Sequence, residues 1–241
     1  MDFKKIIYDN YVEMHTRGLY GKASLDLIKK SFSAWRYYYN KILPVNKNAI
    51  ILDIGCGNGG FVYFLHKQGY IDSHGIDISL QQIDEGHKLG ISNIECVDLY
   101  TFLSERINCF DCIIARDVLE HFKREDIFRI LFLVNNSLKK DGVFIMQSPN
   151  AEGIFYSSIL YGDFTHEIAF TENSIKQIFS NTGFKNIICY PTGPVPKSFF
   201  SHIRWFLWQL LVLKTKFYKA IETGSSRGIF TQNLIAKSQK N

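Results

Sequence analysis

Residues 50–60 read IILDIGCGNGG, and this stretch decides the fold of the chain. Its apolar, β-branched beginning predicts a buried strand, and the glycines that follow permit the positive φ angles of a tight turn. Residues 61–66 then begin a helix, whose N-terminal amides face whatever the turn binds. The stretch therefore predicts a turn that binds a nucleotide cofactor.

Two kinds of nucleotide cofactor fit this turn. Gly55, Gly57 and Gly60 match the G-x-G-x-x-G spacing of dinucleotide-binding turns, but that spacing alone is a weak signal. Asp53 discriminates better, because a fixed carboxylate at the mouth of the turn repels a pyrophosphate and attracts the ammonium and sulfonium of S-adenosylmethionine (SAM). SAM is therefore the predicted cofactor, and an NAD-dependent oxidoreductase is the alternative.

A second carboxylate stands at the end of the next predicted strand, residues 73–78. Asp77 lies 24 positions after Asp53, and an acidic residue at such a strand tip accepts both hydroxyls of a ribose. Asp77 and Ile78 are therefore candidate cofactor-binding residues. Because NAD enzymes use the same contact, Asp77 indicates a ribose and not a particular chemistry.

With an acidic residue before its G-x-G turn, the chain resembles the class I SAM-dependent methyltransferases. The resemblance implies an α/β, Rossmann-like fold with a seven-stranded, mostly parallel sheet, whose last strand is antiparallel and inserts between the fifth and sixth. It implies that Asp53, Gly55 and Gly57 contact SAM and that Asp98 and Leu99, after the third strand, lie beside the adenine. Asp98 is also a candidate helix N-cap, and the two roles are compatible.

Strands and helices alternate along the chain, which predicts a parallel sheet with right-handed crossovers. The predicted strands cover residues 50–54, 73–78, 94–97, 110–115, 142–147, 185–190 and 231–237. We divide the chain into an N-terminal helical cap and a methyltransferase domain that contains an acceptor lid and a helical insertion. These parts cover residues 1–44, 45–241, 148–170 and 197–220, respectively.

Composition favours one domain in a reducing compartment. The 241 residues, of which 46% are hydrophobic, suffice for one substantial core. Five cysteines are an odd number, and without a recognisable signal peptide they predict a cytoplasmic protein. Cys109 and Cys112 form a C-x-x-C pair, but no second pair accompanies them, so no metal site is expected.

Charge is unevenly distributed along the chain. Residues 1–44 carry eight basic against four acidic side chains, residues 45–196 twelve against eighteen, and residues 197–241 eight against one. The basic flanks predict an anionic acceptor or a membrane surface as partner. They form no dense basic arm and carry no recognised motif, so nucleic acid is not expected.

Phe199 to Leu213 form a strongly apolar stretch outside the predicted sheet, within a segment, residues 199–219, that is the candidate membrane contact. Arg204 interrupts it, and the clean apolar run is too short to span a membrane. We expect a helix that packs on its own domain or on a second subunit, as in a homodimer. Contact with an anionic face of the inner membrane is the alternative, because Lys214, Lys216 and Lys219 follow at once.

The exit of the fourth strand carries the sequence RDVLEH, residues 116–121. Ligands of open parallel sheets bind beyond the carboxyl ends of the strands, so Arg116 and Asp117 are expected to border the reacting methyl group. An Asp-Val-Leu-Glu-His run is frequent among small-molecule methyltransferases of the class, which makes His121 a catalytic candidate. A helix residue that shields the adenosine pocket is its structural alternative. Glu120 is expected to face solvent.

The segment after the fifth strand is long and aromatic, as is typical of lids and acceptor sites. Thr165-His166, followed shortly by Phe170-Thr171 and an amphipathic helix that ends at Gly183, resembles methyltransferases of bacterial capsule and O-antigen clusters. A histidine can take the proton of a hydroxyl or ammonium acceptor near neutral pH. His166 is the first candidate base and His121 the second; a packed histidine that holds the lid to the sheet is the alternative for His166.

The predicted reaction is methyl transfer from SAM to a small, anionic acceptor in surface polysaccharide biosynthesis, with S-adenosylhomocysteine as product. Candidate acceptors are a sugar hydroxyl, a nucleotide-linked sugar, and a phosphate-bearing group such as phosphoethanolamine or a phosphoramidate. A non-catalytic SAM-binding scaffold subunit is a further alternative. On the N-terminal cap, Tyr11, His15 and Arg36 are weaker candidates for closing over SAM or the acceptor.

Overall fold

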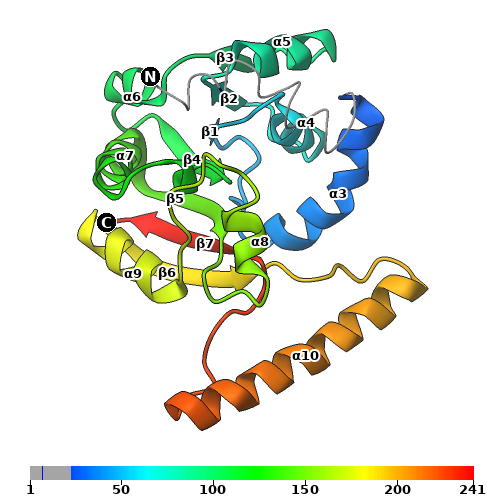
Figure 1. The fold of residues 1–241 in the computed structure, drawn as a ribbon. Coiled ribbons are helices and arrows are strands. Elements are labelled where there is room, and N and C mark those ends of the chain that lie inside the picture. The colour runs from blue at the N-terminus through cyan, green and yellow to red at the C-terminus, as the bar shows by residue number, and fades with distance from the viewer. Residues whose placement is uncertain (1–6, 8–22) are drawn as a thin grey trace.

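The computed structural model of the chain describes Ile7 and residues 23–241, and these residues contain a seven-stranded sheet (Figure 1). The strands are β1 (Ile51–Ile54), β2 (Ser73–Asp77), β3 (Ile94–Cys96), β4 (Phe110–Arg116), β5 (Leu138–Pro149), β6 (Phe184–Pro191) and β7 (Asn233–Lys240). Their order is β3-β2-β1-β4-β5-β7-β6. Strand β7 pairs antiparallel with β5 and β6, and the other pairs are parallel. The predicted fold class and the inserted last strand are confirmed.

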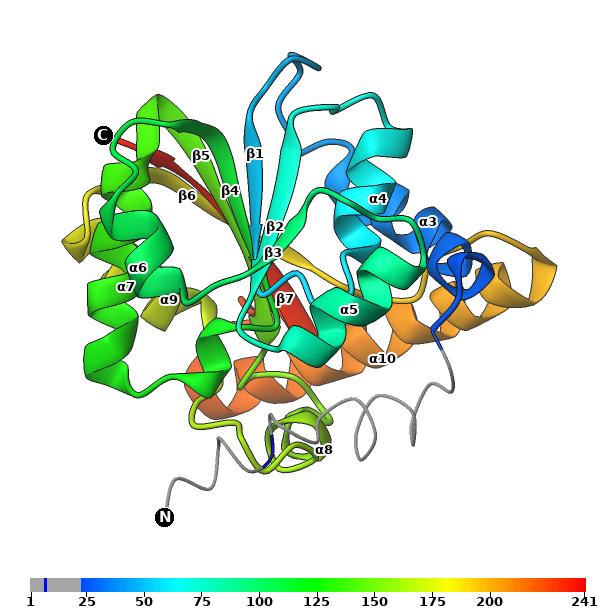
Figure 2. The same ribbon diagram turned by 90° about the horizontal axis from the view of Figure 1, so that it is seen from above.

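Helices cover both faces of this sheet, as Figure 2 shows. One face carries α3 (Leu25–Tyr39), α4 (Gly60–Lys67) and α5 (Leu80–Lys88), and the other carries α6 (Leu99–Ser104), α7 (Arg124–Ser137) and α9 (Glu172–Asn181). Shorter turns η2 (Leu119–His121) and α8 (Tyr156–Leu160) lie near the carboxyl ends of the strands, and α10 (Phe199–Thr223) runs along one side of the domain. The sheet is thus the middle layer of three.

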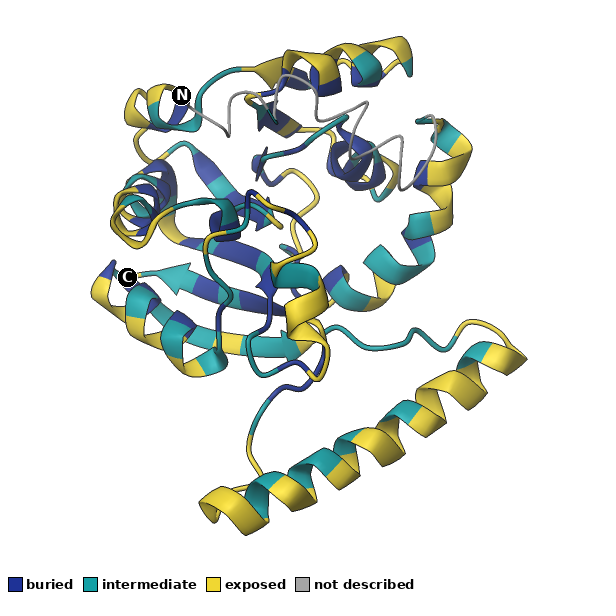
Figure 3. Ribbon diagram, in the orientation of Figure 1, coloured by how far each residue is buried: buried dark blue, intermediate teal, exposed yellow. Residues whose placement is uncertain are grey.

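Each face of the sheet has its own apolar core (Figure 3). Successive side chains of a strand point to opposite faces. Leu52 and Ile54 accordingly pack in the cluster under α6, α7 and α9, whereas Ile51 packs in the cluster under α3, α4 and α5. Strand β1 is buried on both faces, which explains why its sequence is an apolar run instead of an alternating pattern.

Strand β5 is longer than its sequence pattern indicates. It begins at Leu138, directly after α7 ends, and Leu138 pairs with Phe110 of β4. The predicted strand covered only residues 142–147, so Lys139 to Asp141 lay outside it. The pairing register shifts here, because a single residue of β4, between Phe110 and Cys112, lies opposite residues 139–142 of β5.

The helix α10 stands apart from the rest of the fold (Figures 1 and 3). Within the described part of the chain it is the longest helix, and none of its side chains is buried. Trp208 and Val212 are half-buried on the side that faces the domain, and Lys219 of the same side forms an ion pair with Glu152. No helix among the described residues is long and apolar enough to cross a membrane.

Candidate active site

The glycine turn joins β1 to α4 as predicted. Gly55 and Gly57 have φ angles of 67° and 55°, in the left-handed region that favours glycine. A Cβ atom on Gly55 would lie 2.4 Å from the side chain of Val118, so this position needs glycine for space as well as for its conformation. The turn leaves its backbone open to a cleft on each side.

Asp53 is the buried acidic residue of the turn. It is only 2% exposed, and its Oδ1 has no hydrogen-bond partner among the described residues. Burial raises the pKa of this carboxyl to about 7, although the charge of Arg116 acts in the opposite direction. Asp53, Gly55, Trp35 and Arg116 all line one cleft. A buried carboxylate oxygen without a hydrogen-bond partner at such a cleft suits a cationic ligand group, because leaving a buried polar atom unsatisfied is costly.

Asp77 braces the glycine turn, a role that its sequence position alone did not indicate. Its Oδ2 accepts a hydrogen bond from the backbone N–H of Gly57, and its Oδ1 accepts one from the N–H of Ser79, each at 2.8 Å. Asp77 also lines the second cleft together with Ile78. One carboxylate therefore links the end of β2 to the turn while its remaining lone pairs stay at the cleft.

Asp98 is the N-cap of α6. Its Oδ1 accepts hydrogen bonds from the N–H groups of Tyr100 and Thr101, each at 3.0 Å, which confirms the expected cap. Asp98 and Leu99 line the same cleft as Asp77. The apolar side chains of Val97, Leu99 and Phe122 there suit a flat heterocycle. Because the two clefts share residues of the glycine turn, they form one continuous binding region.

Arg116 lines the cleft beside Asp53 and the glycine turn, where aromatic rings surround it. Its guanidinium carbon is 4.3 Å from the ring centre of Phe61 and 5.0 Å from that of Trp35. Arg36 is exposed, with its guanidinium 5.8 Å from the ring of Phe32, and it lines neither cleft. The side of α3 that does line the turn-side cleft carries Leu27, Ile28, Ser31 and Trp35.

Two candidates of the N-terminal cap, Tyr11 and His15, lie outside the described residues. Their expected closure over the cofactor stays a prediction.

Asp117 lies with His121 in the cleft that contains Asp77. Its carboxylate accepts hydrogen bonds from Gln147, at 2.7 Å, and from Asn233, at 3.2 Å. Asp117, directly after β4, thus meets side chains of β5 and β7 at one edge of the sheet.

The expectation that Glu120 faces solvent is wrong. Glu120 is fully buried, because the lid segment crosses over η2 and the N–H groups of Glu167 and Ile168 donate to the carbonyl oxygen of Glu120. Neither of its carboxylate oxygens has a hydrogen-bond partner among the described residues. Burial, with the nearby charges of Asp117 and Asp163, raises the pKa of Glu120 well above its usual value.

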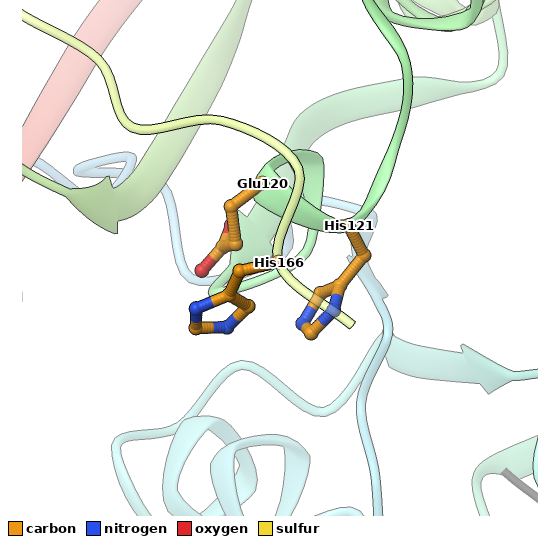
Figure 4. A group of neighbouring side chains, drawn as sticks. All are labelled: Glu120, His121 and His166. Carbon is orange, nitrogen blue, oxygen red and sulfur yellow. The ribbon is translucent and has the colours of Figure 1, made fainter. Parts of the chain in front are cut away.

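The lid brings both candidate histidines to Glu120 (Figure 4). The ring centres of His121 and His166 are 4.7 Å apart, although 45 positions separate them in the sequence. Nδ1 of His166 is 3.0 Å from the carbonyl oxygen of Ile159, and Nδ1 of His121 is 2.8 Å from Oγ1 of Thr165. The structure therefore gathers the two predicted catalytic residues beside one carboxylate that the sequence analysis had placed outside the site.

Comparisons with known proteins define the class. A family model described as a methyltransferase domain matches residues 28–188, about two thirds of the chain. The chain therefore belongs to the methyltransferase domain family. The orphaned carboxylate of Asp53 and the open glycine turn fit the SAM cofactor of this class. The oxidoreductase alternative gains no support from these matches.

Solved structures share the fold at low sequence identity. A SAM-dependent methyltransferase from Archaeoglobus fulgidus is 20% identical, with a TM-score of 0.66 over 88% of this chain and 94% of that one. A possible histamine N-methyltransferase from Thermotoga maritima is 14% identical, with a TM-score of 0.63 over 98% and 99%. Phosphoethanolamine N-methyltransferase 2 from Haemonchus contortus, solved with SAM, is 15% identical, with a TM-score of 0.59 over 97% and 60%.

A curated relative matches part of the chain. Probable (S)-tetrahydroprotoberberine N-methyltransferase 2 from Papaver bracteatum is 28% identical over 121 residues, which are 48% of this chain. The chain spans 34% of the length of that relative. The match supports methyl transfer as the class of reaction and does not identify the acceptor.

Proposed function

We propose that this protein methylates a small, anionic acceptor in surface polysaccharide biosynthesis, with a sugar hydroxyl or nucleotide-linked sugar as the first candidate. The group formed by Glu120, His121 and His166 beside the cofactor cleft carries the proposal. The lid adds exposed aromatic side chains near this group: Tyr161 is 78% and Phe164 is 82% exposed. Aromatic rings pack well against the C–H faces of a sugar ring, and the basic flanks of the chain would attract a sugar that carries a negative charge.

In this proposal the cofactor lies along the continuous binding region. Asp53 holds the ammonium group of SAM, Asp77 holds the ribose hydroxyls, and Asp98 and Leu99 lie beside the adenine. When bound, SAM supplies a methyl carbon whose bond to sulfur breaks as a lone pair of the acceptor atom forms the new bond. The residues of the chain mainly align the two partners, which can contribute about 7–11 kcal/mol.

A base must take the proton that the acceptor loses. Because a carbonyl oxygen only accepts, Nδ1 of His166 donates to Ile159 and the neutral ring carries its lone pair on Nε2. That nitrogen is the proposed proton acceptor. His121 is the second candidate, because its Nδ1 bonds to the hydroxyl of Thr165, which itself donates to Asp163.

The exposed face of α10 supports an anionic membrane surface as the place of reaction. Phe206, Leu210, Leu213, Phe217 and Ile221 recur at spacings of three and four, and each is at least 48% exposed. An apolar stripe that faces away from its own domain, on a helix rich in lysine, is typical of helices that lie on membranes. We propose that α10 docks there and brings the lid to acceptors on lipid carriers; a homodimer through the same stripe is the competing outcome.

Labelled SAM and a panel of acceptors test this function. Nucleotide-linked sugars, sugar phosphates, phosphoethanolamine and free amines are each incubated with the protein, and S-adenosylhomocysteine is measured. We expect the anionic sugars to give product well above the acceptor-free reaction. Faster turnover of amines than of sugars would assign N-methylation to the protein in place of O-methylation. Binding of SAM without product for any acceptor, including extracts of glycan-producing cells, would favour the scaffold subunit.

A further inference from the structure

We propose that Glu120, His121 and His166 bind a divalent transition-metal ion at the acceptor end of the cofactor cleft. One potential ligand atom of each side chain lies within 4.8 Å of those of the other two. Figure 4 shows the three side chains gathered between η2 and the lid. His121 also lines the cleft that contains Asp77, so an ion here would adjoin the cofactor region.

Glu120 supplies the first argument. Its side chain is fully buried, and neither carboxylate oxygen has a hydrogen-bond partner in the described part of the chain. A buried carboxyl group without partners costs several kcal/mol, and native proteins rarely leave one unsatisfied. A bound cation would satisfy both oxygens and offset this cost.

The histidines supply the second argument, because each is oriented as a metal ligand. Ligating histidines usually donate their other ring N–H to a carbonyl, a carboxylate or a bridging group, which fixes the ring and the tautomer. Nδ1 of His166 donates to the carbonyl oxygen of Ile159 at 3.0 Å. The hydroxyl of Thr165 donates to Asp163 at 2.6 Å and therefore accepts from Nδ1 of His121 at 2.8 Å. Both tautomers place the ligating lone pair on Nε2.

The donor set indicates the class of ion. Two imidazole nitrogens and one carboxylate oxygen suit Zn²⁺, Mn²⁺, Co²⁺ or Fe²⁺ better than Mg²⁺, which prefers oxygen ligands. Ligand atoms about 2.1 Å from a common ion lie roughly 3.4 Å apart in tetrahedral geometry, so the group must contract by about 1–1.5 Å. Small shifts of the two half-buried histidine rings that keep their Nδ1 hydrogen bonds would supply this movement. Three protein ligands leave positions open for another molecule.

The open positions would hold the acceptor, and this role rests on the proposed function. An acceptor oxygen bound to the ion has a lowered pKa, so its proton passes to water and its lone pair attacks the methyl carbon. The electron pair of the broken carbon–sulfur bond stays on sulfur, which gives S-adenosylhomocysteine. Under this inference His166 holds the ion, and the proton no longer needs a histidine base.

Metal titration tests the site without any acceptor. Protein without a polyhistidine tag is stripped of metal and titrated with Co²⁺, followed by visible d–d absorption, and with Zn²⁺, followed by calorimetry. We expect one saturable site whose affinity falls about tenfold or more in Glu120→Gln, His121→Ala and His166→Ala. His202→Ala and Glu172→Gln remove the same groups elsewhere, at α10 and α9, and should bind as the wild type does.

The controls separate folding from ligation. Thermal unfolding of each variant is measured without metal, and Zn²⁺ should raise the unfolding temperature of the wild type but not of His166→Ala. Absence of Co²⁺ and Zn²⁺ binding to folded wild-type protein, or equal binding by all variants, would refute the site. Methyl transfer that persists in the presence of a chelator, with no metal bound, would also refute the metal site but would leave the proposed function standing. Metal binding without methylation of any acceptor would support the metal site and count against the proposed function.

Discussion

At the scale of single residues, we propose that Asp53 determines which cofactor the glycine turn accepts. It was identified from its place before Gly55, and the structure adds that it is buried with an unpaired oxygen. In the absence of ligand its raised pKa means that the native state keeps a proton that the unfolded chain loses between pH 3.8 and about 7. This residue therefore contributes less stability as pH rises through that window.

Binding of SAM should show the opposite pH dependence. Only ionised Asp53 attracts the ammonium group, so SAM affinity should rise with pH through about 7, the pKa of this carboxyl without ligand. In Asp53→Asn we expect affinity about tenfold or more weaker at pH 8 and a flat profile, since one charge-assisted hydrogen bond is lost. Calorimetry from pH 5.5 to about 8.5 measures both. An unchanged profile in the variant would assign the titration to another group.

Asp77→Ala should weaken SAM binding more than the loss of a ribose contact alone. The substitution also releases the N–H of Gly57, so the turn loses a brace. Asp77→Asn keeps one acceptor oxygen and should retain more affinity than Asp77→Ala, while both should unfold as single cooperative transitions. Equal SAM affinity in all three proteins would overturn the ribose assignment.

His166→Ala should lower turnover far more than SAM affinity. General acid–base catalysis contributes about 100-fold to 10,000-fold, and kcat should fall within that range. His166 lies on the lid and not on the glycine turn, so the dissociation constant of SAM should change little. If the variant instead loses stability without a specific kinetic defect, the histidine serves to hold the lid to η2.

At the scale of elements, local sequence patterns correctly predicted the features that depend only on residues close together in the sequence. The continuous apolar run of β1 and the glycine turn that follows it were both predicted correctly. Burial of Glu120 could not be read in this way, because the lid that covers it lies more than 40 positions further along the chain. The pairing of His121 with His166 depends on the same crossing.

The outward stripe of α10 gives a prediction at this scale. Phe206→Glu or Phe217→Glu should reduce co-sedimentation with phosphatidylglycerol vesicles about tenfold or more, because each removes a large apolar side chain from the bilayer contact. Phe132→Glu is the matched control, since Phe132 lies on α7 and is 50% exposed. High salt should weaken binding of the wild type. If the vesicles bind none of the proteins and Phe206→Glu turns a dimer into a monomer, the stripe is a subunit interface.

At the scale of the whole molecule, the sheet topology unites the separate observations. The acidic ends of β1, β2 and β3 and the RDVLEH segment after β4 are distant in sequence, and parallel pairing brings them to one edge. This is why the cofactor region followed from sequence spacing. The acceptor end depends on the lid and on α10, whose positions no local pattern specifies.

The central claim is that the acidic glycine turn binds SAM. Calorimetric titration of the metal-free, full-length chain with SAM, S-adenosylhomocysteine and NADH at pH 8 tests it most directly. We predict saturable, one-to-one binding of SAM and S-adenosylhomocysteine that Asp53→Asn weakens, and no binding of NADH. Binding of NADH at the same site, or no binding of either sulfur compound by folded protein, would contradict the account.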